Sequence, residues 1–163
     1  MLLKTAIKHV ETSNIFKEFK KENPEVFLAH AFTIIHNLQG DWQLGFYSKT
    51  KDKVVVFEIG KQITRSPEEE VFKKPEDRVK PLNMKNVSIT LENAVEIAEK
   101  LVKEKYSAEI VSKIIAILQN LGTEIFNLTL ITQTFNIINV RIDSKTGKIL
   151  SEARQSIMGL RKE

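Results

Sequence analysis

The sequence lacks cysteine altogether and has no long hydrophobic run. A chain without cysteine cannot form disulfides, bind zinc or an iron–sulfur cluster through thiolates, or use a cysteine nucleophile. The nearest approach to a hydrophobic run, residues 114–118, is much shorter than the ~20 residues that a membrane-spanning helix needs. Lys4 and Lys8 interrupt the apolar residues at the start, which therefore do not form the apolar core of a signal peptide. These absences lead us to expect a cytoplasmic protein without a membrane span.

The residues that usually build an active site are also sparse. The six glycines stand apart from one another, so there is no glycine-rich phosphate-binding loop, and no serine lies in a nucleophile elbow. His30 and His36 fall on one predicted strand, but about 20 Å of extended chain separates them, which is too far for one metal ion. The acidic run at residues 68–70 is more typical of a solvated segment than of an acid–base pair. We therefore predict no catalytic residues, no cofactor and no metal site.

Charge is present in moderate amount and is spread along the chain. The 163 residues carry 25 Lys and Arg against 21 Asp and Glu, a formal net charge of +4 that both halves share. This length suits one ordinary domain or two small ones. Nucleic-acid binding is an alternative, because Lys49, Lys51 and Lys53 lie near aromatic residues. Strand alternation, however, assigns Trp42 and Phe46 to the core, which argues against nucleic acid as a partner.

Hydrophobic periodicity predicts helices that are followed by strands. A helical spacing at the start changes to the alternation of a strand beyond Pro24. Residues 12–14, Thr-Ser-Asn, are suited to cap a second short helix, so the first helix is either continuous or broken there. Thr90 is suited to cap a later helix. The predicted elements are a helix over 2–22, strands over 27–36, 42–47 and 54–59, a proline-bearing linker over 66–87, and a helix over 90–106.

Residues 110–118 fit either a buried helix or a buried strand, and a comparison of the two halves favours the strand. Residues 31–38 align with 114–121 without gaps, and the alignment continues after one inserted residue with Trp42 matched to Phe126. The matched apolar positions indicate an internal repeat. The further matched pairs are Leu44 with Leu128, Phe46 with Leu130, Val54 with Ile138 and Val56 with Val140. The predicted strands of the second half cover 113–121, 125–133, 135–143 and 149–154.

The second half resembles the PepSY family in two motifs. Residues 91–98, Leu-Glu-Asn-Ala-Val-Glu-Ile-Ala, resemble that family's L-x-x-A-hydrophobic helix. Residues 140–150, Val-Arg-Ile-Asp-Ser-Lys-Thr-Gly-Lys-Ile-Leu, resemble its V-x-V-D-x-x-T-G-x-hydrophobic-L hairpin. In such a hairpin Asp143 and Thr146 can satisfy turn amides, while Gly147 takes the positive φ that ends the turn. The first half has no corresponding Asp or Thr-Gly, so it would be a degenerate copy.

The resemblance implies a cystatin-like α+β fold without catalysis, in a family that is often secreted or membrane-attached and is thought to bind or restrain peptidases. We accordingly predict two tandem units, each a helix packed on a three- to four-stranded antiparallel sheet. Residues 1–65 would form the first, degenerate unit, residues 66–87 the linker and residues 88–163 the second unit. Units this small bury only about 60% of their extended surface, so we expect them to pack against each other.

The functional prediction is a noncatalytic binding or regulatory module that recognises a peptide or a partner protein. Binding would occur on the concave face of the sheet or by addition of a strand to an exposed edge. Trp42 and Phe126, matched in the two halves, are candidates to line a ligand cleft, although core packing is the simpler role for both. A small-molecule carrier or an enzyme that uses a cavity between helix and sheet is the alternative. The sequence leaves the oligomeric state open.

Overall fold

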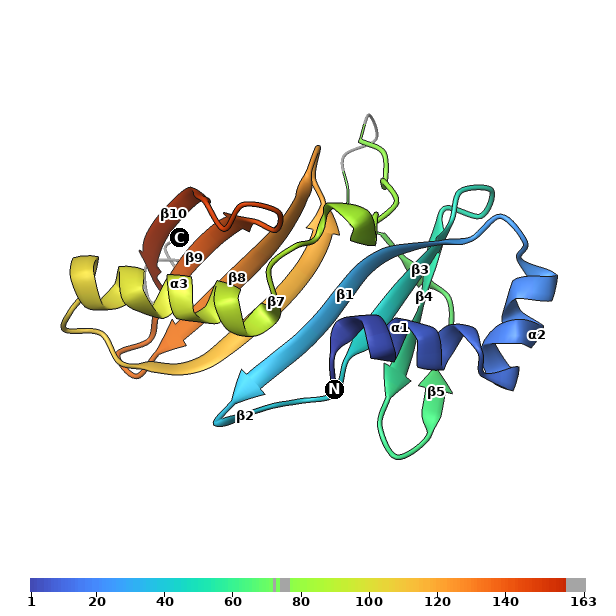
Figure 1. The fold of residues 1–163 in the computed structure, drawn as a ribbon, viewed down its shortest axis with the longest axis horizontal. Coiled ribbons are helices and arrows are strands. Elements are labelled where there is room, and N and C mark those ends of the chain that lie inside the picture. The colour runs from blue at the N-terminus through green and yellow to red at the C-terminus, as the bar shows by residue number, and fades with distance from the viewer. Residues whose placement is uncertain (72, 74–76, 158–163) are drawn as a thin grey trace.

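The computed structural model describes residues 1–71, 73 and 77–157. Over these residues the chain is an α+β protein with three α-helices and one antiparallel sheet (Figure 1). Residues 72 and 74–76 of the predicted linker, which include Pro75, and residues 158–163 of the second predicted unit lie outside the described residues. In chain order the elements are α1 (Leu3–Glu11), α2 (Asn14–Glu22), β1 (Phe27–His36), β2 (Leu38–Gln39), β3 (Gln43–Ser48), β4 (Lys53–Ile59), β5 (Ile63–Arg65), β6 (Glu69–Glu70), the 3-10 helix η1 (Met84–Asn86), α3 (Leu91–Lys105), β7 (Val111–Asn120), β8 (Glu124–Thr132), β9 (Asn136–Asp143) and β10 (Ile149–Ser156).

The first helical segment is broken at Thr12 and Ser13, which settles the alternative that the sequence left open. Ser13 has the extended backbone of an N-cap residue, and its hydroxyl accepts a hydrogen bond from Phe16 N at 3.3 Å. The same hydroxyl donates to Val10 O at 2.6 Å, in the last turn of α1. The serine therefore ends one helix and starts the next, because its side chain replaces bonds that a continuous helix would form.

The second half follows the predicted order of elements. Thr90 caps α3 in a reciprocal pair: its hydroxyl accepts from Asn93 N at 3.1 Å, and Asn93 Oδ1 accepts from Thr90 N at 3.0 Å. This arrangement satisfies two amide groups that the helix itself leaves free. The ambiguous residues 110–118 fall almost entirely in β7, so the interpretation as a strand is confirmed.

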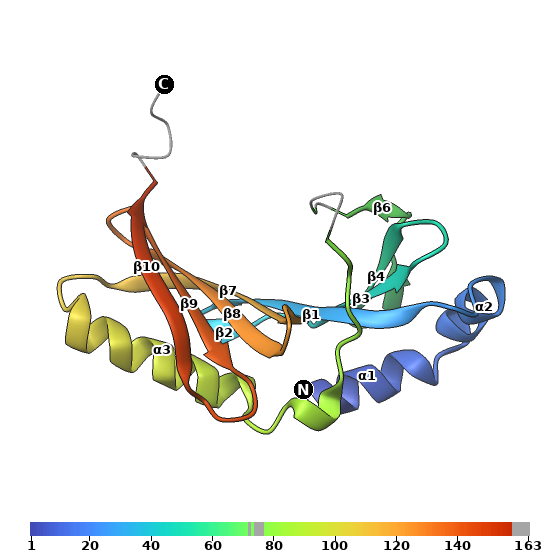
Figure 2. The same cartoon turned by 90° about the horizontal axis from the view of Figure 1, so that it is seen from above.

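The sheet runs through the whole molecule in the order β10-β9-β8-β7-β1-β3-β4-β5, with β2 beside β1 and β6 beside β4. The strands that were predicted as two separate sheets therefore form one. Helices α1 and α3 cover one face, which we call the helix face (Figure 2). The chain after β6 starts on the opposite face, the open face, and reaches the helix face at η1 (Figure 2).

Strands β1 and β7 join the two halves of the sheet. They pair antiparallel, with Ala31 opposite Leu118, Thr33 opposite Ala116 and Ile35 opposite Ile114. The alignment of residues 31–38 with 114–121 matches Thr33 with Ala116. Ala31 therefore lies opposite Leu118, the aligned counterpart of Ile35, and Ile35 lies opposite Ile114, the aligned counterpart of Ala31. Thr33 lies opposite its own counterpart.

The main core lies between the helix face and the helices. The side chains of Leu128, Ile138 and Val140 are fully buried there. In β4 the buried residues are Val55, Phe57 and Ile59. Val54 and Val56, which the sequence alignment matched to Ile138 and Val140, are only half-buried and alternate with them. That part of the alignment is therefore wrong by one residue, because four residues separate β3 from β4 but three separate β8 from β9.

The segment over residues 66–87 is more than a connection. It contributes β6 to the sheet and forms η1. Leu82 is buried, and its backbone N–H donates to Leu28 O at 2.9 Å near the start of β1. Asn120 Nδ2 donates to Pro81 O at 3.0 Å from the end of β7. These contacts fix the path by which the chain returns to the helix face before α3.

Candidate functional site

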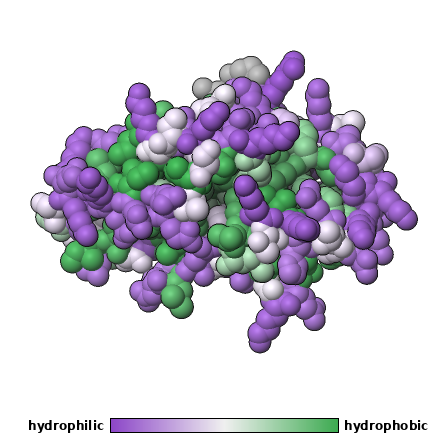
Figure 3. All heavy atoms as spheres, viewed as in Figure 1, coloured by the Kyte–Doolittle hydropathy of each residue, from purple (hydrophilic) through white to green (hydrophobic). Residues whose placement is uncertain are grey.

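A cavity of about 220 Å³ opens on the helix face where α1 and α3 begin. Trp42 and Phe126, the two cleft residues proposed from the sequence, both line it. They are 4% and 2% exposed, so their rings contribute to the core as well as to the cavity. The walls come from residues 1–4 on one side and from residues 87–92 on the other, with Gln39 and Met84. In the same view as Figure 1, Figure 3 shows hydrophobic surface at the centre of this face, between hydrophilic regions.

The N-terminal wall is tied to the aromatic floor. Trp42 Nε1 donates a hydrogen bond to Met1 O at 3.0 Å. Leu2 is the N-cap residue of α1 and lines the cavity, but its side chain cannot cap the helix. The positive end of the α1 dipole therefore lies beside the cavity without a capping side chain. Lys4 adds a full positive charge to the same wall, and Glu92 adds a negative charge to the opposite wall.

A buried carboxylate holds the second wall in place. Glu124 is 3% exposed, and its two oxygens accept hydrogen bonds from Asn83 N at 2.9 Å and Asn86 Nδ2 at 3.1 Å. Ser144 is fully buried, and its carbonyl oxygen accepts from Ser88 N at 2.8 Å and Ile89 N at 3.0 Å. Sequence reasoning missed Glu124, although its position two residues before Phe126 places it on the same face of the strand.

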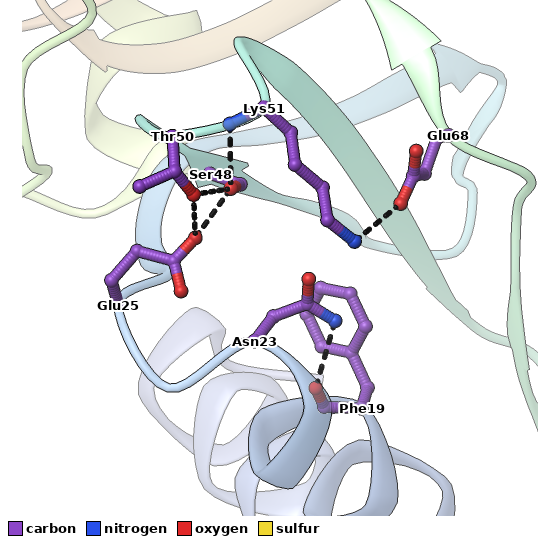
Figure 4. A network of polar contacts seen from close by, with 7 residues as sticks. All are labelled: Phe19, Asn23, Glu25, Ser48, Thr50, Lys51 and Glu68. Atoms are coloured by element: carbon purple, nitrogen blue, oxygen red, sulfur yellow. Dashed lines mark hydrogen bonds and ion pairs between the residues drawn. The ribbon is translucent and has the colours of Figure 1, made fainter.

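In each half, a glutamate just before the first long strand accepts hydrogen bonds from the turn after the second long strand. These glutamates are Glu25, before β1, and Glu109, before β7. In the first half, Glu25 Oε1 accepts from Ser48 Oγ at 2.5 Å and from Thr50 Oγ1 at 2.7 Å (Figure 4). These hydrogen bonds lower the pKa of Glu25 to about 2. Ser48 itself is buried, so the contact fixes the chain between α2 and β1 against the β3–β4 turn.

The second half contains the corresponding contact. Glu109 accepts from Thr134 Oγ1 at 2.8 Å and from Asn136 Nδ2 at 2.7 Å. Hydrogen bonding to Thr132, Thr134 and Asn136 holds the pKa of Glu109 below its usual value. The offset that matches Trp42 with Phe126 also matches Glu25 with Glu109 and Thr50 with Thr134. Sequence reasoning missed this pair, although extending the alignment at that same offset would have found it.

The three residues predicted to shape the C-terminal hairpin lie in the turn between β9 and β10. Asp143 Oδ1 accepts from Lys145 N at 2.8 Å and from Thr146 N at 3.0 Å, and these backbone hydrogen bonds lower the pKa of Asp143. Thr146 Oγ1 accepts from Lys148 N at 3.2 Å. Gly147 has a φ of +79°, a conformation that disfavours residues with a Cβ.

The aromatic residues considered for nucleic-acid binding are not available as a surface beside the lysines. Trp42 and Phe46 are buried in the core of the helix face. Lys51 and Lys53 form ion pairs of 3.0 Å with Glu68 and Glu70 on the strand and loop that lie beside β4. The two lysines therefore have acidic partners within the chain, which argues further against a role in binding nucleic acid.

The histidines and carboxylates do not converge. His30 lies over Gly45, where an added Cβ would come within 2.0 Å of His30 Cε1, and burial lowers the pKa of His30. In the part of the chain that the structure describes, no three His, Asp or Glu side chains are grouped as metal ligands. None of the described helices is both long enough and apolar enough to cross a membrane.

Comparison with known proteins gives one informative similarity. No protein-family model matches the chain, and no curated protein matches it. The chain is similar to the crystal structure of a protein from Clostridium difficile 630 described as a "putative lipoprotein", with a TM-score of 0.57 and 17% sequence identity. The similarity covers 87% of this chain and 91% of the other. At this identity the comparison establishes a shared fold.

The same similarity corrects the expected location. The sequence led us to expect a cytoplasmic protein, but the structural neighbour is described as a lipoprotein, a description that points to a membrane-anchored or extracytoplasmic protein. The prediction of a cytoplasmic location is therefore wrong. The error arose because the prediction rested on two absences, of a signal-peptide pattern and of a membrane-spanning run, and such absences do not locate a protein.

Proposed function

We propose that this protein is a noncatalytic binding module that recognises a peptide or a segment of a partner protein through the helix-face cavity. The observation that carries the proposal is the meeting of Trp42 and Phe126 in one cavity between the starts of α1 and α3. Two aromatic rings at the bottom of a cavity offer a large apolar contact area with a fixed geometry.

The size and chemistry of the cavity favour one apolar side chain as its occupant. Its 220 Å³ is below the range of about 300–1,000 Å³ that is usual for sites of whole small-molecule ligands. Ser88 and Thr90 lie among the apolar lining residues and offer hydroxyl groups to the main chain of a peptide. Lys4 and Glu92 on opposite walls suit an extended segment that carries groups of both signs.

A small-molecule carrier or an enzyme has less support. Such a function would be favoured by a buried cluster of polar side chains inside the cavity, but the most buried lining residues are Trp42, Phe126 and Leu91. The buried polar residues Glu124 and Ser144 lie behind the wall, and their hydrogen bonds go to the chain over residues 83–89. These two residues serve to hold the wall.

We further infer that the chain consists of two tandem units of the PepSY-like type, related by an approximate twofold axis through Thr33 and Ala116. The β1–β7 register and the paired contacts of Glu25 and Glu109 support this organisation. The binding cavity would then lie close to the axis, since Trp42 and Phe126 are matched residues. An action outside the cytoplasm, on a peptidase or another partner of that compartment, fits both the resemblance and the structural neighbour.

The single tryptophan of the chain, Trp42, allows a direct test. Its fluorescence is measured while purified protein is titrated with blocked pentapeptides that carry Leu, Met, Phe or Asp between glycines. We expect a shift of the emission with the apolar peptides and none with Asp. Leu2→Arg, which changes an exposed leucine of the cavity wall, should weaken binding at least tenfold.

Leu121→Arg is the matched control, because Leu121 is also an exposed leucine but does not line the cavity. It should leave binding unchanged. If none of the apolar peptides changes the emission at millimolar concentration, or if Leu2→Arg and Leu121→Arg bind alike, the cavity is not the recognition site.

A further inference from the structure

The two ends of the sheet differ in how they are protected. The path of strands ends at β5 on one side and at β10 on the other. β5 has three residues, whereas β10 has eight, Ile149–Ser156. Proteins usually protect exposed edge strands by making them short, by β-bulges, or by placing proline or charged residues on them, lysine above all. β10 is long and contains neither proline nor lysine; its register shift lies at its start, between Ile149 and Ser151, and its two charged side chains, Glu152 and Arg154, are of opposite sign. Among the described strands none pairs with its outer side.

The register of β10 shows which backbone groups are free. Ile157 N donates to Phe135 O at 2.9 Å, and Ser156 lies opposite Asn136. In an antiparallel ladder, opposite residues exchange hydrogen bonds at every second position. Counting back from Ile157 in steps of two reaches Ala153, which therefore exchanges hydrogen bonds with Asn139 of β9. The N–H and C=O groups of Glu152 and Arg154 then point away from β9, toward the free edge.

The side chains of these two residues are already held in place. Glu152 accepts from Tyr106 Oη at 2.7 Å and pairs with Lys105. The Arg154 guanidinium lies 5.0 Å from the centre of the Tyr106 ring, and its Nη1 is 3.8 Å from Glu109 Oε1. Glu152 and Arg154 therefore place opposite charges two residues apart on the helix face of the edge strand. Their contacts within the chain already restrict the conformations of both side chains.

A second copy of this chain fits the edge in one register better than in its neighbours. Antiparallel pairing requires that outward-facing residues lie opposite each other. A register centred on Glu152 places that carboxylate opposite itself, and one centred on Arg154 does the same with two guanidinium groups. The register between them, centred on Ala153, places Glu152 of each copy opposite Arg154 of the other. Charge thus selects the register.

We propose that the protein forms a twofold-symmetric dimer in which β10 pairs antiparallel with β10 of a second copy, centred on Ala153. Glu152 and Arg154 of each copy exchange backbone hydrogen bonds and form two ion pairs across the junction. Ala153 meets its counterpart at the axis, where a small side chain allows the close approach of a non-hydrogen-bonded pair. The same mode of association already joins β1 to β7 within the chain.

Two charge reversals test the proposal by complementation. Arg154→Glu places Glu opposite Glu152 in a dimer of like copies, and Glu152→Arg places Arg opposite Arg154. In sedimentation-equilibrium experiments at low salt we expect the wild-type protein to dimerise with rising concentration. Each variant alone should show at least a tenfold higher dissociation constant. An equimolar mixture of the two variants should recover the wild-type association, because both facing pairs are then of opposite charge.

Lys17→Glu and Glu18→Arg are matched controls, because they reverse exposed charges on α2. They should dimerise like the wild type. A wild-type protein that stays monomeric up to millimolar concentration, or a mixture of the two edge variants that stays as weak as either alone, overturns the proposal. Hydrogen exchange on the wild type requires no variant: the amides of Glu152 and Arg154 should become protected as the concentration rises, and exchange independent of concentration contradicts the dimer.

Discussion

The two halves of the molecule share a layout but fill their cores with different side chains. In the first half, Phe57 lies within 5.2 to 5.7 Å of the rings of Phe16, Phe19 and Phe46, measured between ring centres. In the second half, the positions on the central strands hold Leu128 and Val140, and the buried residues of α3 are small or aliphatic, with alanine at two of them. In the first half α1 also buries small residues, Ala6 and Val10, so the aromatic cluster comes from α2 and from the strands that it covers.

The two halves agree in the polar contacts of Glu25 and Glu109 and differ in the composition of their cores and in the length of one turn. The Glu25 and Glu109 contacts use the same type of residue in both halves, and Thr33 still lies opposite Ala116. Volume can be redistributed between helix and sheet provided that the total is maintained. A hydrogen-bonded carboxylate has a narrower tolerance, since the distance and direction of each bond are fixed.

The largest contrast should come from truncating the central core residue of each half. We expect Phe57→Ala to lower the free energy of unfolding by about 4 kcal/mol, because it removes a fully buried ring and leaves a cavity among three others. Val140→Ala, at a fully buried position of the second half, should cost roughly 2 kcal/mol. Urea denaturation measures both.

Val56→Ala is the control for this comparison, because Val56 is half-buried on the open face between two core positions of β4. Its cost should stay under about 1 kcal/mol. Equal losses for Phe57→Ala and Val140→Ala would mean that the aromatic cluster adds nothing to the stability of the first half.

A smaller contrast is expected from the two carboxylates, and it depends on pH. Hydrogen bonds in the folded state lower the pKa of Glu25 from its ordinary 4.5 to about 2. Below pH 4.5 the unfolded chain therefore takes up a proton that the folded chain does not, so stability falls as the pH falls from 4.5 toward 2. Glu25→Gln should flatten this dependence in urea denaturation measured at several pH values.

Glu109→Gln is the matched variant in the second half, since the pKa of Glu109 is also lowered by hydrogen bonds. It should flatten the same part of the curve, and the double variant should flatten it further than either single change. A curve for Glu25→Gln that follows the wild type throughout this range would show that the contact with Ser48 and Thr50 does not favour the ionised carboxylate.

The smallest contrast concerns the helix caps. Thr90→Ala removes one half of a reciprocal pair with Asn93 and should cost about 1 kcal/mol. Ser13→Ala removes a longer cap bond, 3.3 Å from Phe16 N, together with the 2.6 Å bond that the hydroxyl donates to Val10 O, and should also cost about 1 kcal/mol. Circular dichroism during urea denaturation measures both, with Thr5→Ala on the exposed side of α1 as the control. A greater loss for Ser13→Ala would show that the break between α1 and α2 matters more than either cap bond.

The sequence predicted the α+β class and the longer helices and strands, because hydrophobic periodicity is a local signal. It did not predict the short elements β2, β5, β6 and η1, nor that Trp42 and Phe126, each assigned to its own half, would line one cavity. It did not predict that β1 and β7 would join one sheet, since the partner of an edge strand depends on distant residues. The mismatch at Val54 and Val56 arose from one extra turn residue, which alternation alone does not reveal. Glu124 and Glu109 were missed because a single carboxylate in a strand has no signature until its hydrogen-bond partners are known.

The pairing of β1 with β7 has a consequence for the order of folding. The other neighbouring strands along the path of the sheet are also close to each other in the sequence. In contrast, half of the sequence lies between Thr33 of β1 and Ala116 of β7. Closing so long a loop costs entropy before any contact repays it, so contacts of this kind form slowly. We expect the hairpins of each half to form first and the central seam to close in the rate-limiting step. Until it closes, each half presents one of its longest strands as an unpaired edge.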